Sequence, residues 1–433
     1  MPDRAEILRG SILHVPTDPF RTAGALRFHE DGGLLIQDGR IAACGEYPAV
    51  SAAHPAATVT DLRGGFLLPG FVDTHVHFPQ VRVVGALGRQ LLEWLDCCAL
   101  PEEARMADVA YARRTAQAFT HALASHGTTT ALVFGAHFAA ATAELFLEAE
   151  RTGLRIIAGL VISDRNLRAH LHSTPEVAYR ESTALIGRFH GKGRLLYAVT
   201  PRFAFSTSEA MLEVCQTLLR ENAGLRFQTH MNENGQEIAA VADLFPWAPD
   251  YFAVYERYGL CGPRAVLAHN VHPMPAELER LARTGTFVAH CPCSNSALGS
   301  GVFPMQRHLR AGVRFSLGTD VGAGTGFNMM KEAVHSYLVQ RVAHDAMVLE
   351  PAQLLYLMTL AGAEALGLGA ETGSFEAGKS ADVVYLRAPE GSPLAHSLEC
   401  KDTGPGMLSA LLTQAGAESV REVRVEGKVV YQQ

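Results

Sequence analysis

The sequence predicts an α/β protein, a TIM-like (β/α)8 barrel with a small β-sandwich domain formed by both chain ends. Two observations predict the barrel. About eight short apolar runs rich in β-branched residues recur along the chain, and segments with helical periodicity separate them. A third observation predicts the small domain, because short apolar runs and Gly-containing turns dominate both ends of the chain.

The barrel strands are expected at the apolar runs. These runs span residues 71–77, 128–134, 155–162, 195–200, 225–230, 265–269, 286–290 and 313–319. Strands that alternate with helices need long crossover connections, which favour a parallel sheet. A doubly wound open sheet would produce the same alternation. Eight strands, however, is the number that a closed barrel requires.

Two of the separating segments show the helical pattern clearly. In residues 206–222, apolar side chains form a single stripe at helical spacing. Ser206, with Glu209 three positions later, predicts a capping box at the start of this helix. A similar stripe in residues 275–285 predicts a second helix, which is expected to end at Gly285.

The two ends of the chain are expected to build the small domain together. We predict that residues 1–68 and 373–433 form this discontinuous domain, with the barrel, residues 69–372, inserted between them. Within the second part, residues 388–406 have the composition of a long loop or of an excursion that contacts a partner subunit. The sequence agrees with both of these interpretations.

Composition and charge exclude several classes of partner. The chain has 433 residues, 48% of them hydrophobic, which is enough for a large core. The formal net charge is −7 and no basic run stands out, so we expect no nucleic-acid partner. No apolar run is long enough to span a bilayer, and the first residues lack the pattern of a signal peptide. We therefore expect a cytoplasmic protein without a membrane partner.

The eight cysteines are scattered along the chain rather than arranged in a framework. We expect them to be reduced, as in other cytosolic proteins of this size. Cys97 with Cys98 and Cys291 with Cys293 lack the C-x2-C spacing of a zinc site. These cysteines are therefore expected to serve packing and not metal binding.

Four of the predicted strands end in side chains that can bind a metal or move a proton. The first strand ends in His75 and His77, which share one face because residues two apart on a strand point the same way. The fifth ends in His230, the sixth in His269 and the eighth in Asp320. In a (β/α)8 barrel the carboxyl ends of the strands form one face, so these distant residues should meet there.

A metal site explains this group better than separate structural roles do. Each histidine alone could be a satisfied buried polar residue, and Asp320 alone could be an ordinary turn residue. Together, without a cation, they would form a costly unpartnered cluster. We expect His75, His77, His230 and Asp320 to hold one metal ion through three nitrogens and one oxygen, a set that suits Zn²⁺ and also admits Fe²⁺.

The motifs around these residues resemble those of the amidohydrolase superfamily, and the resemblance covers essentially the whole chain. The motifs are PGFVDTHVH, THMNE, AHNVH and GTDVGAG, flanked by FEAGKSADVV and VEGKVVY. Some members of the superfamily hold two metal ions bridged by a carboxylated lysine at the end of the fourth strand. Here that strand ends in VTPRF, and Lys192 lies at its start. The resemblance therefore implies one metal ion.

Within this superfamily the chain is most similar to the guanine deaminases. The motifs are THVHFPQ, LLEWLDCCALPEE, VTPRF, THMNEN and AHCPCSNSALGSG. The resemblance implies deamination of guanine to xanthine, a homodimer, and a pocket wall formed by residues 290–295. It also implies a purine site lined by Gln80, Arg202, Phe203, His77, His230, Glu233 and Asp320.

The residue types suit this reaction. A metal ion can lower the pKa of a bound water from about 15.7 to about 7, and Asp320 could take the proton of this water. Glu233 lies three residues after His230 and could protonate N3 of the purine, so that C2 is attacked and ammonia leaves. His269 would orient the attacking hydroxide or stabilise the developing charge. Arg202 only donates hydrogen bonds, which suits O6 of guanine and opposes the amino group of adenine.

Two alternatives stay open at this stage. One is a sister enzyme with the same metal ligands, which would act on S-adenosylhomocysteine, a cytosine-like base or a triazine. Arg202 and Gln80 are the residues expected to distinguish these substrates. The other is a non-catalytic scaffold that kept the fold; such a protein should have lost part of the ligand set, which is complete here.

Overall fold

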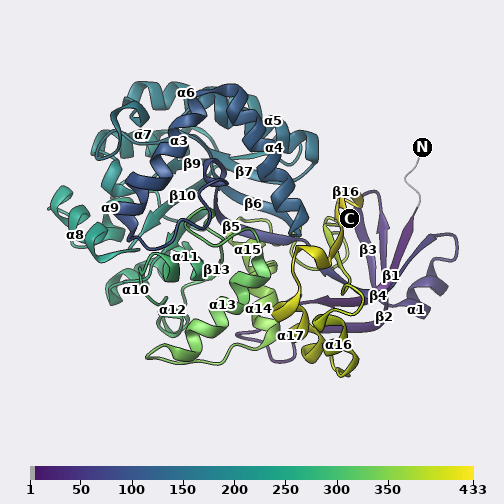
Figure 1. Ribbon diagram of the computed structural model, residues 1–433. Helices are drawn as coiled ribbons and strands as arrows, with labels where there is room; N and C mark the ends of the chain where they lie inside the picture. The colour runs from purple at the N-terminus through teal and green to yellow at the C-terminus, as the bar shows by residue number, and fades with distance from the viewer. Residues whose placement is uncertain (1–4) are drawn as a thin grey trace.

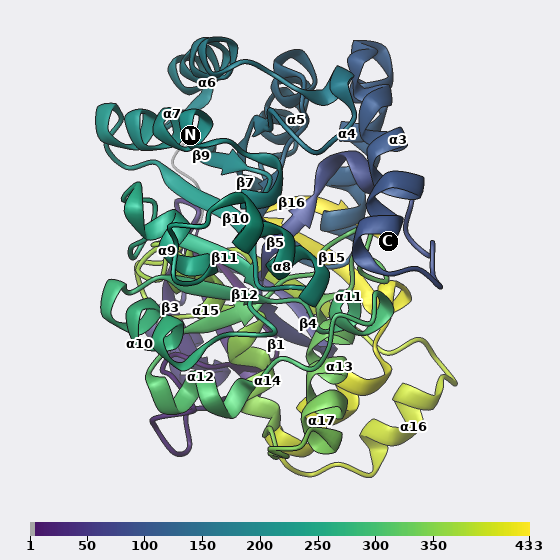
Figure 2. The same ribbon diagram turned by 90° about the vertical axis from the view of Figure 1, so that its left-hand side faces the viewer.

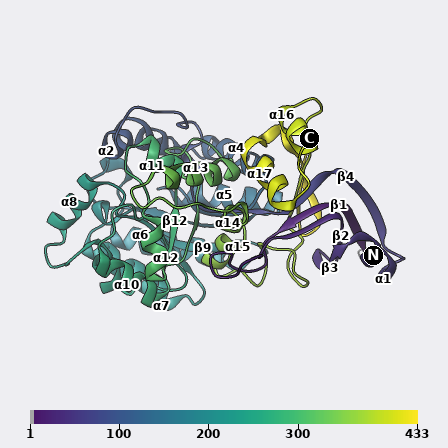
Figure 3. The same ribbon diagram turned by 90° about the horizontal axis from the view of Figure 1, so that it is seen from below.

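The structure, a computed structural model, describes residues 5–433 as a barrel surrounded by helices and joined to a smaller sheet (Figure 1). Seen from below, the two parts lie side by side (Figure 3). The predicted combination of a (β/α)8 barrel with a domain made from the chain ends is confirmed. Within the described range, no helix has the length and apolar character that crossing a bilayer requires.

Eight parallel strands form the barrel close to the predicted positions. They are β5 (Phe71–His77), β6 (Thr128–Phe134), β7 (Arg155–Gly159), β9 (Leu196–Pro201), β10 (Arg226–Met231), β11 (Ala265–His269), β12 (Phe287–His290) and β13 (Phe315–Leu317), while the short β8 (Val161–Ile162) pairs with β9 beside this path. The N–H of Asp320 donates to the carbonyl of His75 (2.8 Å), and that of His77 to Val321 (3.0 Å). These bonds join the two ends of the sheet, which is therefore a nearly closed barrel.

Helices cover the outside of the barrel, as the view toward its strands shows (Figure 2). They include α4 (Val109–Ser125), α5 (Ala139–Thr152), α6 (Pro175–Phe189), α7 (Glu209–Glu221), α8 (Gly235–Leu244), α9 (Tyr251–Arg257), α10 (Pro275–Thr284), α12 (Met305–Ala311) and α13 (Met329–Val342). The two predicted helices are α7 and α10. Gly285 ends α10 in the left-handed region, with a φ of 72°, which a residue without Cβ adopts easily.

The predicted capping box at the start of α7 is wrong. Ser208 caps the helix, because its Oγ accepts a hydrogen bond from the N–H of Met211 (3.2 Å). Ser206 is buried in the turn that follows β9, where its hydroxyl donates to the carbonyl of Phe203 (3.3 Å). The two serines lie two residues apart. The spacing to Glu209 favoured Ser206, but in the folded chain the hydroxyl of Ser206 makes other contacts.

Strands from both chain ends form one continuous seven-stranded sheet, in the order β16-β15-β14-β4-β1-β2-β3. The strands are β1 (Glu6–His14), β2 (Arg27–Gln37), β3 (Arg40–Glu46), β4 (Thr58–Pro69), β14 (Val383–Leu386), β15 (Val420–Val425) and β16 (Lys428–Gln432). Only β1 and β4 pair in parallel; the other neighbours are antiparallel. The small domain thus joins the two ends of the chain through backbone hydrogen bonds.

The segment 388–406 is partly helical and not a simple loop. It contains α16 (Pro393–Glu399) and the start of α17 (Gly404–Gln414). Helix α17 packs against α13 and α14 (Pro351–Leu357), which belong to the barrel. The boundaries of the two domains, residues 1–68 with 373–433 and residues 69–372, therefore stay a proposal, since part of the terminal region lies on the barrel.

Candidate metal centre and catalytic pocket

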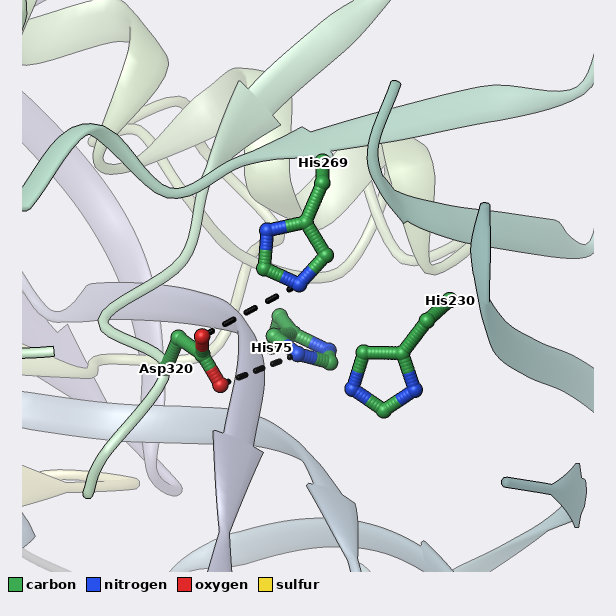
Figure 4. A group of neighbouring side chains, drawn as sticks. All are labelled: His75, His230, His269 and Asp320. Carbon is green, nitrogen blue, oxygen red and sulfur yellow. Dashed lines mark ion pairs between the residues drawn. The ribbon is translucent and has the colours of Figure 1, made fainter. Parts of the chain in front are cut away.

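Five predicted residues meet at the carboxyl end of the barrel. The ligand atoms of His75, His230, His269 and Asp320 all lie within 4.8 Å of one another, and all four side chains are buried (Figure 4). Oδ1 of Asp320 lies 3.2 Å from Nε2 of His75 and 3.1 Å from Nε2 of His77. Nε2 of His77 is also 3.3 Å from Nε2 of His230. The convergence predicted from four separate strands is present.

A buried aspartate below the paired histidines ties the first strand to the last. Oδ1 of Asp73 accepts hydrogen bonds from the N–H groups of His75 and Thr319, both at 3.1 Å, and Oδ2 accepts from the Thr319 hydroxyl at 2.5 Å. Burial raises the pKa of Asp73 to about 7, while these hydrogen bonds act in the opposite direction. Thr319 directly precedes Asp320, so Asp73 fixes the position of the carboxylate in the site.

The backbone at the strand ends adopts a conformation that is rare for residues with a side chain. The φ angles are 73° at His269, 45° at Asn270, 48° at Asp320 and 53° at Asn232. Left-handed residues other than glycine are held only where the surrounding structure fixes them, and they concentrate at functional sites. The side chains of His269 and Asp320 belong to the cluster, while those of Asn232 and Asn270 hydrogen-bond to each other beside it.

Hydrogen bonds at Nδ1 orient two of the imidazoles. Nδ1 of His230 lies 2.6 Å from the carbonyl oxygen of Arg202, which can only accept, so this nitrogen carries the proton. Nδ1 of His269 lies 2.9 Å from Oδ1 of Asn295 and donates to it in the same way. In both rings Nε2 is left with a lone pair that faces the cluster. This second hydrogen bond is the usual arrangement for a metal-binding histidine.

The cluster fits a divalent metal ion. Within the described residues, Nε2 of His75 and Nε2 of His269 are buried without a hydrogen-bond partner. Burial lowers the pKa of His75 to about 4 and that of His230 well below its ordinary value, so both rings are neutral. Burial acts to raise the pKa of Asp320. The favourable interaction of its carboxylate with His75 outweighs this effect, so the pKa stays well below its ordinary value. Neutral imidazoles beside an ionised carboxylate are the forms that bind such an ion.

Glu233 lies beside the cluster as a buried carboxyl group. Burial, together with the nearby charge of Asp320, raises the pKa of Glu233 to about 8. Its Oε1 accepts a hydrogen bond from the hydroxyl of Ser300 (3.2 Å), and its Oε2 is 3.5 Å from Nε2 of His269. Glu237 holds the backbone in place, since it accepts from the N–H of Glu233 (3.1 Å). Glu233 is thus suited to hold a proton near neutral pH and to release it.

A small, partly open cavity lies beside these groups. Its wall is formed by His77, Gln80, Leu91, Trp94, Leu95, Arg202, Phe203, His230, Glu233, His269, Leu298, Asp320 and Ala323. The structure therefore brings every predicted substrate-binding residue to one cavity. The sequence did not assign roles to Trp94, Leu95 or Leu298, although all three lie in motifs that carried the resemblance.

Residues of the segment 290–295 hydrogen-bond to two members of the metal-binding cluster. The hydroxyl of Ser294 donates to Oδ2 of Asp320 (2.6 Å), and Asn295 holds His269. His290 is fully buried and its ring stacks on Phe303, with centroids 4.4 Å apart. This segment was expected to form the pocket wall, but on this side the lining residue is Leu298, one turn later. Lys192 lies before β9, at the amino end of the barrel and away from the site.

Comparisons with known proteins agree on one family. The sequence profile described as "Amidohydrolase family" matches residues 66–430, and that of an "Imidazolonepropionase-like composite domain, bacteria" matches residues 32–57. A protein of Deinococcus radiodurans named "Probable guanine deaminase" is 55% identical over 432 residues, which cover 98% of each chain.

Solved structures with similar folds include enzymes with the same name. Guanine deaminase of E. coli has a TM-score of 0.94 and 39% sequence identity, covering 99% of both chains. A guanine deaminase from C. acetobutylicum, with guanine bound in its active site, has a TM-score of 0.90 and 25% identity. This likeness covers 99% of the present chain and 100% of the other.

Proposed function

We propose that this chain, which belongs to the amidohydrolase family, catalyses the hydrolytic deamination of guanine to xanthine and ammonia. One observation carries the proposal. Two groups that can donate hydrogen bonds to a purine, Arg202 and Gln80, line the same cavity as the histidine and aspartate cluster and as the carboxyl group of Glu233. Relatives named as guanine deaminases match nearly the whole length of the chain, which supports the same activity.

We assign one Zn²⁺ ion to His75, His77, His230 and Asp320, with Fe²⁺ as the alternative. When bound, such an ion supplies a water molecule that is acidic enough to act as a nucleophile near neutral pH. His269 belongs to the same cluster, but its Nε2 also faces Glu233. We therefore give His269 the role of orienting the attacking water and stabilising the charge that develops on it.

Glu233 supplies the proton transfers of the reaction. Its raised pKa keeps the carboxyl group largely protonated near pH 7, so it can protonate N3 of the purine and make C2 electrophilic. Asp320 remains ionised and can accept the proton of the attacking water. Glu233, once deprotonated, can take the proton of the C2 hydroxyl as the carbonyl forms and pass it to the departing amino group. The proton held by Asp320 then returns to Glu233, which restores both carboxyl groups. Water and guanine thereby give xanthine and ammonia, with each proton accounted for.

Arg202 and Phe203 determine how the base is held. The guanidinium of Arg202 is buried and can only donate, so it suits the O6 oxygen of guanine. An amino group at that position would bring two donors together in a buried site, which is strongly unfavourable. Phe203 offers an aromatic surface to the base at 3% exposure.

Ammonia release from a panel of substrates tests this function. The purified protein is incubated with guanine, adenine, cytosine, ammeline and S-adenosylhomocysteine, and ammonia is measured. We expect a clear preference for guanine. A preference for another substrate of the panel would leave the hydrolase class in place and move this chain to a sister activity. No release from any of them would favour the non-catalytic scaffold.

Two further proposals concern the setting of the enzyme. A cytoplasmic location is supported by the cysteines, all eight of which are free thiols, as expected in a reducing compartment. A homodimer is supported by exposed apolar side chains at the end of α13 and after it, among them Val342, which is 83% exposed, and Val348, which is 61% exposed. Sedimentation of the purified protein would decide between monomer and dimer.

A further inference from the structure

A buried carboxylate, Glu103, connects two residues of the pocket wall. It lies on α3 (Leu100–Ala104) and is 2% exposed. Its Oε1 accepts hydrogen bonds from Nε2 of Gln80 (2.7 Å) and from Nη1 of Arg202 (2.8 Å). Its Oε2 accepts from the same Nη1 (2.7 Å) and lies 3.0 Å from Nε2 of His137. The proposed proton transfers do not use this residue.

The hydrogen bonds of Gln80 leave its amide only one orientation. The side-chain oxygen of Gln80 accepts from the N–H of Gly322 (3.1 Å), while its nitrogen donates to Glu103. A rotated amide would place its oxygen against the carboxylate and its NH₂ group against the N–H of Gly322, so both hydrogen bonds would be lost. Gln80 lines the cavity, and the hydrogen that remains free on its nitrogen is what it can offer there.

Arg202 is fixed by the same carboxylate. Nη1 makes both hydrogen bonds to Glu103, and among the described residues no acceptor is bonded to Nε or Nη2. These two nitrogens can only donate. Because Oε1 of Glu103 accepts from both Gln80 and Arg202, and Oε2 accepts from Arg202 again, both groups are turned so that donors alone are left for a ligand. A carboxylate that only balanced the charge of Arg202 would not need the contact with Gln80.

We propose that Glu103 is a positioning residue that makes this side of the pocket a pure donor surface. It thereby selects purines that present acceptors such as O6 over purines with an amino group at C6. This inference rests on the proposed function and deepens it, because it explains why Gln80, whose amide could otherwise donate or accept, does not weaken the discrimination by Arg202.

The E103Q variant tests the proposal, because glutamine keeps the shape but replaces one acceptor oxygen with an NH₂ donor. Gln80 and Arg202 are then left with a single acceptor oxygen that carries no charge, so the amide of Gln80 is no longer held in one orientation and can turn its oxygen into the pocket. We expect kcat/KM for guanine to fall about 10- to 100-fold, the range for losing a hydrogen bond to a charged group, mainly through KM. Metal content should stay at the level of the parent protein.

The preference for guanine over a purine with an amino group at C6 is the decisive measurement, because a merely structural role of Glu103 would leave this preference unchanged. Guanine is compared with 2,6-diaminopurine, which carries an amino group in place of O6, as a substrate or, where release is slow, as a competitive inhibitor. We expect the preference for guanine to fall about tenfold in E103Q, which corresponds to one hydrogen bond. D382N is the matched control, since Asp382 is also a buried carboxylate paired with an arginine but lies far from the cavity; its preference should equal that of the parent.

The outcomes separate the inference from the function on which it rests. If the parent deaminates guanine and E103Q keeps the parental preference, or loses both bases equally, the positioning role is wrong and the proposed function stands. If the parent does not deaminate guanine, both are wrong. Should E103Q fail to fold, E103D keeps the charge but shortens the reach; its preference should lie below that of the parent, and an unchanged value would overturn the inference.

Discussion

Strand β9 has a buried arginine–carboxylate pair at each of its ends, and the two pairs do different things. Before the strand, Nη2 of Arg194 donates to Oδ2 of Asp382 at 2.6 Å. After it, Nη1 of Arg202 donates to Oε2 of Glu103 at 2.7 Å. Both pairs combine the same two chemical groups, and all four side chains are nearly inaccessible. They lie at opposite ends of the barrel axis.

At the amino end, Arg194 and Asp382 make further hydrogen bonds to other groups of the protein. Arg194 also donates to the hydroxyl of Ser380 (3.0 Å), and Asp382 accepts further hydrogen bonds from Ser380, Thr372 and the N–H of Glu426. These contacts join the barrel to the small sheet. At the carboxyl end, Arg202 keeps donors for a ligand in the cavity. A pair of equal chemistry therefore stabilises the fold at one end and recognises substrate at the other, as the (β/α)8 architecture leads us to expect.

Removing the proton carrier of the carboxyl end should have the largest effect on catalysis. In Glu233→Gln the side chain keeps its size but can no longer transfer a proton, so we expect turnover of guanine to fall by about 10⁴-fold, the upper part of the range for general acid–base catalysis. Ammonia release and metal content are measured on the same sample. Metal content should be unchanged, and near-parental turnover would show that Glu233 does not carry the proton.

Changing the arginine of the carboxyl end should have the next largest effect. Arg202→Ala removes charge-assisted hydrogen bonds, each of about 1.5–3 kcal/mol, so kcat/KM for guanine should fall about 100-fold or more. It also leaves Glu103 buried without its cation, which should lower the free energy of unfolding by about 3–5 kcal/mol. Steady-state kinetics and urea unfolding measure the two losses. If Arg202→Ala lowered the free energy of unfolding but left kcat/KM unchanged, the proposed difference in role between the two arginine–carboxylate pairs would be wrong.

The matching change at the amino end should leave catalysis almost untouched. Asp382→Asn breaks a buried pair, so we expect a loss of about 3–5 kcal/mol in unfolding free energy at pH 7, with kcat/KM of the folded protein equal to that of the parent. A large fall in kcat/KM would contradict the division of roles between the two ends.

The pH dependence of this loss has a definite sign. Burial acts to raise the pKa of Asp382, but Arg194 outweighs it, and the pKa in the folded protein is below its ordinary value. A lowered carboxyl pKa contributes stability that is present above the unfolded pKa of about 3.9 and disappears as the pH falls through the folded value. The stability difference between parent and D382N should therefore be full near pH 7 and shrink in acid, as unfolding curves at several pH values would show.

The sequence predicted the part of the site that is formed by residues at the carboxyl ends of the barrel strands. His75, His77, His230, His269 and Asp320 could be brought together in advance, because each follows an apolar run and all strand ends of a parallel barrel lie on one face. Arg202 and Gln80 came from a family resemblance and not from periodicity. Their places in the cavity agree with it.

The groups that the sequence left without a role are those held by long irregular segments. Glu103 reaches the pocket only because residues 81–107 fold over the barrel as short helices and turns, and nothing in the local pattern indicates that path. Ser300 was also left without a role, although its hydroxyl donates to Glu233, and Asn295, expected as part of a pocket wall, accepts a hydrogen bond from His269 instead. The prediction of the helix cap was wrong for a related reason, since the hydroxyl of Ser206 also lies 3.2 Å from that of Ser163, a residue distant in sequence.

The most direct test of the central claim measures metal content and guanine deamination on the same protein sample. Metal is removed with a chelator and Zn²⁺ is then added back in steps. We expect the metal-free protein to release no ammonia, and activity to rise in proportion to bound metal until one ion per chain is reached. Full deamination of guanine by the metal-free protein would contradict the claim that the clustered strand-end residues work through a bound cation.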